Sequence, residues 1–197
     1  MPVEAPDEIL SSIVALGRAV FGAAACSLAL LEPDEEHLVF HAAAGAGAHE
    51  VRGLRLPVDR GIAGWVVSSG QPIVVHEVRA DPRFARDVAE STGYVPTSIM
   101  AMPLETSRDL LGVIEVLDRA PVEGRDDLGL LALLATQAAR AVELLRGADQ
   151  ASARSPELPE VLAVLHRLGA EEQQAAATLL AGFVTYLERR GGPSGLV

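Results

Sequence analysis

Two pairs of apolar segments, each joined by a short polar turn, constrain the fold of this chain most strongly. The first pair flanks Pro33-Asp34-Glu35 and the second flanks a turn at 105–109, so that the predicted strands are 25–32, 37–44, 98–104 and 110–117. Parallel strands need a crossover of a dozen or more residues, whereas antiparallel strands can be joined by a tight turn. The two pairs therefore predict β-hairpins in an antiparallel sheet, and an α+β fold class.

Helical periodicity frames the two hairpins. Apolar residues recur at helical spacing between Pro6 and Gly22, which predicts a first helix, and a long helix is expected over Asp126–Arg146. Between the hairpins the sequence predicts a short helix ending at Gly70, a brief β-rich run and a helix that Gly93 ends. No Gly-x-Gly-x-x-Gly motif follows a strand, which argues against a dinucleotide-binding fold.

The composition changes after the long helix. Residues 147–156 (GADQASARSP) are small and polar, which is typical of a linker. Beyond them, apolar residues at helical spacing predict two helices, at about 157–168 and 171–190, separated by Gly169. We therefore expect a globular domain at 1–146, a linker at 147–156 and a C-terminal helical tail at 157–197 that forms a helical hairpin.

The charge balance excludes some classes of partner. The chain has 27 acidic and 16 basic residues, all of the latter arginine, and a formal net charge of −11. Nucleic-acid binders and proteins that dock on anionic lipid need clustered basic residues. No run reaches the ~18 apolar residues of a membrane span, and the acidic N-terminus lacks the basic region of a secretion signal. We expect a cytoplasmic protein with no nucleic-acid or membrane partner.

The single cysteine limits redox and metal chemistry. Cys26 alone cannot form an internal disulfide, a multi-thiolate metal site or a cycle that needs two thiols. We interpret it as a small buried apolar residue rather than a reactive thiol. The five histidines show no paired metal-ligand spacing, so we predict no metal site and no resident cofactor.

Five motifs occur in an order and spacing that resemble the GAF domain, a sensor module of bacteria and eukaryotes. They are Gly61-Ile62-Ala63-Gly64-Trp65-Val66, Gly70-Gln71-Pro72-Ile73-Val74-Val75, Asp81-Pro82-Arg83-Phe84, Ser98-Ile99-Met100-Ala101-Met102-Pro103-Leu104 and Gly112-Val113-Ile114-Glu115-Val116-Leu117-Asp118. The resemblance covers roughly residues 6–146 and indicates a stand-alone bacterial GAF-domain protein.

The resemblance implies a central antiparallel sheet with the N- and C-terminal helices on one face. A small-molecule pocket is expected on the other face, under loops and short helices. GAF domains bind cyclic nucleotides, linear tetrapyrroles, haem or small metabolites, and others have no known ligand and serve as dimerisation units. Because one fold carries several functions, the site must be argued from its own residues.

Three branches of the family fit the residues poorly. The tetrapyrrole-binding branch needs a cysteine near the region that corresponds to 81–94, and Cys26 lies far from it in sequence. The branch that reduces methionine sulfoxide uses several cysteines. The cyclic-nucleotide branch carries an Asn-Lys-x-Asp signature, and this chain has no lysine.

We predict a ligand pocket bounded by six residues, namely Trp65, His76, Phe84, Tyr94, Met100 and Glu115. Each has a structural alternative. The tryptophan either lines the pocket or plugs the core, and the histidine is a polar rim residue or, less in keeping with its position, a haem ligand. The two other aromatic residues either stack a flat ligand or cap the core.

Glu115 is the most informative of these residues. It lies inside an apolar strand and shares a face with Val113 and Leu117. A carboxylate buried there is costly without a partner. It either accepts an N–H from a ligand or pairs with an arginine.

The sequence shows no catalytic arrangement, so we expect a non-enzymatic regulatory protein that senses a small molecule, a partner protein or both. A ligand-free dimerisation or scaffold protein is the alternative, and a haem-based sensor is the third reading. We also expect a homodimer, because apolar residues of the long helix form a heptad seam, at Leu128, Leu131, Ala135, Ala138, Val142 and Leu145. Its alternative is a monomer in which the tail covers this helix.

Overall fold

The computed structural model describes residues 4–154 of the 197, with side chains from residue 8 to residue 146. The chain divides into two units, Met1–Ala148 and Asp149–Val197. The first unit holds the sheet and the site described below. The tail helices expected within 157–197 lie outside the described residues.

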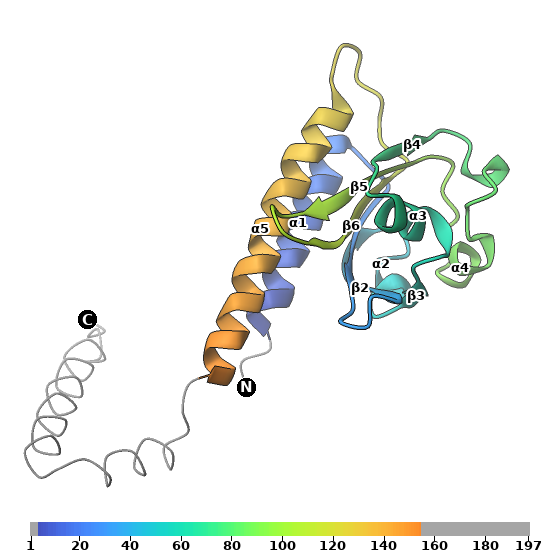
Figure 1. Cartoon of the computed structure of the whole chain (residues 1–197). Helices are drawn as coiled ribbons and strands as arrows, with labels where there is room; N and C mark the ends of the chain where they lie inside the picture. Colours follow the sequence, from blue (N-terminus) through green and yellow to red (C-terminus); the bar gives the residue numbers. More distant parts are fainter. Residues whose placement is uncertain (1–3, 155–197) are drawn as a thin grey trace, which may run out of the picture. The chain divides into compact units, whose positions relative to one another are not determined.

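A six-stranded sheet in the order β3-β2-β1-β6-β5-β4 forms the centre of the domain (Figure 1). All neighbouring strands are antiparallel. Both expected hairpins are confirmed, and the strands are β1 (Ala25–Leu31), β2 (His37–Gly45), β3 (Arg55–Pro57), β4 (Ile73–Val75), β5 (Ile99–Glu105) and β6 (Leu110–Leu117). The α+β fold class is therefore as the sequence predicts.

Helices α1 (Glu4–Phe21) and α5 (Asp127–Arg154) lie against one face of the sheet (Figure 1). Their inward side chains join those of the central strands in one hydrophobic cluster, in which Val14 of α1 and Leu131 of α5 are fully buried. Small residues on α5 allow a close approach to the sheet, since Ala138 and Ala139 are also fully buried.

Short elements cover the other face. They are α2 (Ala48–Val51), α3 (Gly61–Ser69), the 3₁₀ turn η1 (Val78–Ala80) and α4 (Arg86–Ser91). Helix α3 packs tightly against the segment that follows β3, because a Cβ on Gly64 would lie 2.6 Å from the backbone oxygen of Val58. Gly70 ends this helix in the left-handed conformation, as the sequence predicts.

The structure corrects the expected end of the long helix. Helix α5 continues to Arg154 and includes most of the segment 147–156 that the sequence predicts as a linker. Alanine, glutamine and arginine in this segment favour a helix, and the first proline comes only at Pro156. A run of small residues therefore does not by itself indicate a linker.

The structure also corrects the predicted dimer seam. Leu131, Ala135, Ala138 and Val142 are at most 2% exposed, because they pack against the domain's own sheet. Leu128 packs against the same cluster, and Leu145 is half-buried. The heptad spacing therefore marks the face that covers the sheet, not a face free to meet a second subunit. The exposed leucines of α5 are Leu133 and Leu144.

By length and composition, the segment Asp127–Arg146 of α5 is apolar enough to cross a membrane. The same segment contributes five buried side chains to the cluster over the sheet. This packing accounts for the apolar residues on the inner side of the segment, of which 28% is buried inside the domain.

Candidate functional site

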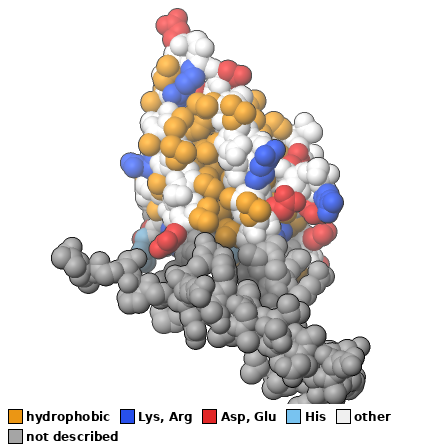
Figure 2. Space-filling model, turned by 90° about the vertical axis from the view of Figure 1, so that its left-hand side faces the viewer, with side chains coloured by type: hydrophobic (Ala, Val, Ile, Leu, Met, Phe, Trp, Pro, Cys, Tyr) orange, Lys and Arg blue, Asp and Glu red, His pale blue; other side chains and the backbone are white. Residues whose placement is uncertain are grey.

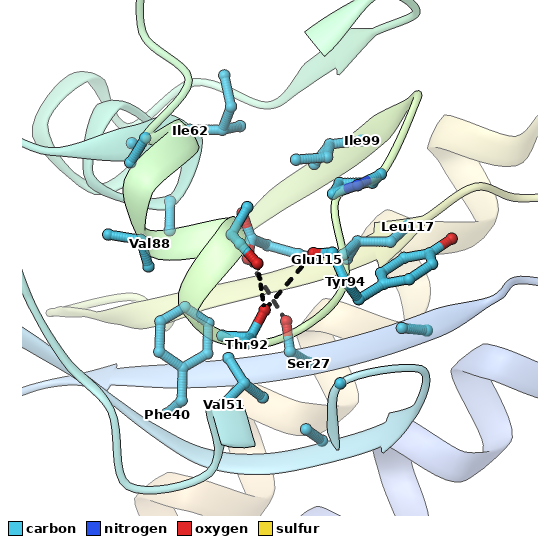
Figure 3. Close-up of a pocket in the computed structure, with 18 of the residues that line it drawn as sticks. Ser27, Phe40, Val51, Ile62, Val88, Thr92, Tyr94, Ile99, Glu115 and Leu117 are labelled. Carbon is cyan, nitrogen blue, oxygen red and sulfur yellow. Dashed lines mark hydrogen bonds between the residues drawn. The ribbon is translucent and has the colours of Figure 1, made fainter. Parts of the chain in front are cut away.

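A cavity of about 100 Å³ lies between the sheet and its cover of short helices (Figure 3). Strands β1, β2 and β6 form its floor, and α3, α4 and the segment 92–96 form its walls and roof. Most of the lining is apolar, including Phe40, Ile62, Val88, Ile99 and Leu117. The site thus has the concave, apolar form of a small-molecule pocket, although its volume is below the usual range of roughly 300–1,000 Å³.

Glu115 is the carboxylate of this cavity. Strand alternation turns its side chain to the cavity face, and the β1–β6 register places it opposite Ser27. The Ser27 hydroxyl donates to Glu115 Oε2 over 3.4 Å, which is a weak contact (Figure 3). Burial raises the pKa of Glu115 to about 7, although the Ser27 hydroxyl acts in the opposite direction.

No arginine pairs with Glu115 among the described residues, so the ion pair considered from the sequence is not formed. The nearby arginines have other partners: Arg60 binds Asp87 at 2.7 Å and Arg83 binds Asp81 at 2.6 Å. The Glu115 carboxyl therefore lines the cavity without a cationic partner among the described residues.

Two further polar side chains line the cavity at the end of α4. The Thr92 hydroxyl is occupied locally, because it donates to the backbone oxygen of Ala89 at 2.8 Å and lies 3.5 Å from that of Tyr94. The Tyr94 phenol donates to Asp118 Oδ2 at 2.5 Å. Burial, followed by this bond, raises the pKa of Tyr94 to about 12.

Asp118 holds the loop that leads from α4 to β5. Its Oδ1 accepts the backbone N–H groups of Thr97 and Ser98 at 2.9 and 2.8 Å, while Oδ2 accepts the Tyr94 phenol. The residue adopts a positive φ of 50° at the end of β6, a conformation that aspartate tolerates better than most residues. One carboxylate thus fixes both ends of the segment 94–98.

Arg119, which follows Asp118, contacts the start of α5. Arg119 forms an ion pair with Asp127, the first residue of α5, and Arg125 binds the same carboxylate. Asp127 is only 7% exposed. Residues 118 and 119 therefore connect the roof of the cavity to the start of α5.

The only cysteine lies at the edge of the cavity but is not reactive. Burial, together with the charge of Glu115, raises the pKa of the Cys26 thiol to about 12. At neutral pH it stays protonated, and the thiolate is the nucleophilic form. This agrees with its interpretation as a small buried residue.

Three of the six predicted pocket residues line the cavity: Phe84, Tyr94 and Glu115. Met100 does not, because it faces the helix-covered side of the sheet and is 1% exposed. Trp65 is half-buried on α3 and lies under Arg83, whose guanidinium carbon is 4.7 Å from the ring centroid. The pocket assignments of these two residues are corrected: Met100 belongs to the core under the long helices, and Trp65 packs against the core on the cavity side, which was its structural alternative.

His76 is also outside the cavity. It is exposed and borders a separate hollow of about 360 Å³ near Thr97 and Asp118. None of the histidines within the described part of the chain lines the cavity under α3 and α4. The candidate haem ligand therefore does not reach the site.

Sequence reasoning missed Ser27 and Asp118. Ser27 meets Glu115 only through the pairing of β1 with β6, which joins residues 88 positions apart and leaves no local signal. Asp118 ends one of the recognised motifs, and an acidic residue directly after an apolar strand was the available signal.

The hairpin turn between β1 and β2 carries a cluster of Glu32, Asp34 and His37, whose ligand atoms lie within 4.8 Å of one another. Arg55 of β3 binds Glu32 at 2.6 Å and Asp34 at 2.9 Å. The cluster therefore ties this turn to the edge strand.

Comparisons with known proteins agree with this architecture. The model of the GAF domain matches residues 5–142. A protein described as the probable 3',5'-cyclic phosphodiesterase pde-5 of Caenorhabditis elegans is 31% identical over 86 residues, which are 44% of this chain and 11% of that protein. The chain thus spans about a tenth of the length of this relative.

Solved GAF domains share the fold. That of a phosphoenolpyruvate-protein phosphotransferase from Coxiella burnetii has a TM-score of 0.65 at 19% identity, over 76% of this chain and 89% of that one. The second GAF domain of DevS from Mycobacterium smegmatis has a TM-score of 0.59 at 20% identity, over 74% and 98%. A free methionine-R-sulfoxide reductase from Neisseria meningitidis has a TM-score of 0.58 at 23% identity, over 73% and 81%.

The residues matched by the family model, 5–142, contain the sheet and the covered cavity described above. This match shows that the chain belongs to the GAF domain family.

Proposed function

We propose that this protein is a non-enzymatic regulatory module that binds a small molecule in the cavity above Glu115 and acts as a homodimer. The observation that carries the proposal is the Glu115 carboxyl itself, buried at the cavity wall with one weak partner, Ser27. A buried carboxyl lowers stability unless it is well hydrogen-bonded. A ligand that completes its hydrogen bonds explains why an acid stands in an apolar strand.

The chemistry of the lining favours binding over catalysis. The Ser27 hydroxyl faces a carboxyl that no third group within the described part of the chain orients, and the Cys26 thiol has a raised pKa. A nucleophile needs an adjacent base or a lowered pKa. The hydrolysis of cyclic nucleotides named for the worm relative, and the reductase activity named for the Neisseria protein, belong to those proteins.

The route from the cavity to the helices supports a regulatory role. A ligand under α4 displaces or orders Tyr94, which is bonded to Asp118. The following Arg119 holds Asp127 at the start of α5. Occupancy of the cavity thus acts on the end of a long helix, through which a partner protein or a second subunit receives the signal.

The outer sides of α1 and α5 support the homodimer. Figure 2 views the side where Figure 1 draws these helices, and hydrophobic side chains gather there among charged ones. The exposed large apolar residues of the two helices are Ile9, Leu16, Val20, Leu133 and Leu144. They repeat at helical spacing on the surface of each helix, as apolar residues do where one helix packs on another. The same surface favours the alternative function, a scaffold that dimerises without a ligand.

A cavity-filling variant tests the proposal. Ala89 of α4 lines the cavity, whereas its neighbour Glu90 is exposed. We expect a ligand found among nucleotides, amino acids and other metabolites to raise the melting temperature of the native protein and of Glu90→Leu. Ala89→Leu should lose this increase. A broad screen without a single hit, on a protein that sediments as a dimer, would favour the scaffold instead.

A further inference from the structure

We propose that the ligand of this cavity is a small organic ammonium ion, that is, a protonated amine on a compact apolar body, which donates N–H bonds to Glu115 and Ser27. This inference rests on the proposed function, since it names the class of molecule that the same cavity takes.

The charges around the cavity exclude the opposite class of ligand. Glu115 is the acidic residue among those that line it, and no arginine or histidine of the described part of the chain lines it. The two nearest ion pairs described above neutralise Arg60 and Arg83 outside the cavity. A phosphate or carboxylate group would therefore be buried without a cation, which is costly.

The hydrogen bonds at the floor are incomplete in a way that suits an amine. Glu115 Oε2 accepts only the long 3.4 Å contact from Ser27, and Oε1 has no hydrogen-bond partner among the described residues. A carboxylate offers about four lone-pair sites, and an ammonium group offers three N–H donors. Ser27 donates its proton to Glu115, so the lone pairs of its oxygen are free to accept from the same ammonium.

The rest of the cavity fits an apolar body. Phe40 and Val88 lie across from Ile99 and Leu117, and the volume is about 100 Å³ (Figure 3). A branched or cyclic hydrocarbon of a few carbons fills such a space, whereas a large flat cofactor does not enter it. The amine end meets the sheet and the hydrocarbon end meets α3 and α4.

The Glu115 side chain is largely withdrawn from bulk solvent, since the residue is 8% exposed. Burial disfavours the ionised form of Glu115, and an ammonium ion beside it favours that form. The affinity for an amine should therefore rise with pH as the carboxyl ionises. Between pH 6 and pH 8 we expect an increase of about tenfold for a carboxyl with a pKa near 7.

Three probes of one shape test the inference: isoamylamine, isoamyl alcohol and isovalerate, titrated into the full chain by calorimetry and by NMR at pH 8. The carboxylate probe is included because the first turn of α3 borders the cavity with no side-chain cap on its N–H groups. We expect the amine to bind about tenfold or more tightly than the other two, the increment of a charge-assisted bond.

Two variants identify the group responsible. Glu115→Gln keeps the shape but removes the charge, and should abolish the preference for the amine. Glu105→Gln, at an exposed site, should keep it. At pH 6, where most of the Glu115 carboxyl of the native protein is protonated, the NMR signal of its carboxyl carbon should move toward the ionised position when the amine binds. This measurement needs no variant.

The outcomes separate this inference from the proposed function. Equal or tighter binding of the alcohol or the carboxylate, or an amine preference that survives in Glu115→Gln, overturns the ammonium assignment and leaves a ligand-binding cavity. Failure of all three probes to shift any cavity resonance overturns both.

Discussion

The phenol of Tyr94 donates a 2.5 Å hydrogen bond to Asp118. Asp118 lies 24 positions further along the chain, directly after strand β6. The bond joins the roof of the cavity to the residue that follows β6. Because Asp118 also accepts the N–H groups of Thr97 and Ser98, its carboxylate is the side chain that holds both ends of the loop above the cavity.

Removal of the Tyr94 hydroxyl should loosen this roof without emptying the core. We expect Tyr94→Phe to lower the free energy of unfolding by about 1 kcal/mol, the net value of one such bond. Asp118→Asn should lower it more, because it weakens the acceptor of three bonds at once. Urea unfolding of both variants measures these two decreases in the free energy of unfolding and shows which is larger. Equal stability of Tyr94→Phe and the native protein would show that the bond is not maintained in solution.

The Glu115 carboxyl should make stability depend on pH. Its pKa is raised from 4.5 in the unfolded chain to about 7 in the fold. Between these values the folded state holds a proton that the unfolded state has released, so the free energy of unfolding falls as pH rises. The loss due to this one group is about 3 kcal/mol from pH 4.5 to pH 7.

Glu115→Gln should lack this dependence. Urea unfolding at intervals from pH 4.5 to pH 8 should give a variant that gains on the native protein as pH rises. Glu105→Gln, which changes an exposed carboxyl, is the control and should show no such gain. A difference between Glu115→Gln and the native protein that stays constant with pH would mean that the buried carboxyl titrates normally.

Gly64 is expected to tolerate no side chain. A Cβ there would lie 2.6 Å from the backbone oxygen of Val58, so α3 would have to move away from the segment that follows β3. We expect Gly64→Ala to lower the free energy of unfolding by about 2–3 kcal/mol, in the range of overpacked cores. Gly17→Ala is the comparison: its nearest neighbour, Leu134 Cδ2 at 2.9 Å, is the end of a side chain and can shift. Thermal unfolding should rank Gly64→Ala well below Gly17→Ala.

Charge placed on the outer side of the helix pair should split the proposed dimer. Leu133 and Leu144 are 65% and 75% exposed, so Leu133→Glu with Leu144→Glu leaves the core intact. We expect a monomer by sedimentation at micromolar concentration, with an unchanged circular dichroism spectrum. Val122→Glu alters an exposed apolar residue outside the helices and should stay dimeric. A native protein that sediments as a monomer would remove the dimer from the proposal.

The sequence predicts the sheet well because its signals are local. Each hairpin lies within one continuous stretch of sequence, which consists of an apolar run, a polar turn and a second apolar run. The end of α3 is likewise marked locally, by Gly70. The position of Glu115 on the cavity face follows from strand alternation alone. Phe84 and Tyr94 were predictable from the family resemblance, because it implies that loops and short helices cover the pocket.

The errors come from which face an element buries. Met100 and Glu115 are on paired strands, but Met100 is opposite Val116 and so faces the helices. The heptad in α5 is real, yet its partner is a sheet, and periodicity cannot distinguish a sheet from a second helix. Ser27 could not be identified because β1 pairs with β6 across 88 positions of sequence, and no local pattern shows that pairing.

Asp118 and Arg119 are neighbours in sequence but hold different parts of the domain, one the loop above the cavity and the other the start of α5. The single peptide bond between the two residues therefore fixes the relative direction of their side chains. One residue inserted at this bond would leave both side chains in the protein, but their contacts could no longer form together. Under the proposed function, such an insertion would separate occupancy of the cavity from its effect on the start of α5. The link that we propose therefore depends on the chain register at residues 118 and 119 as well as on the two side chains.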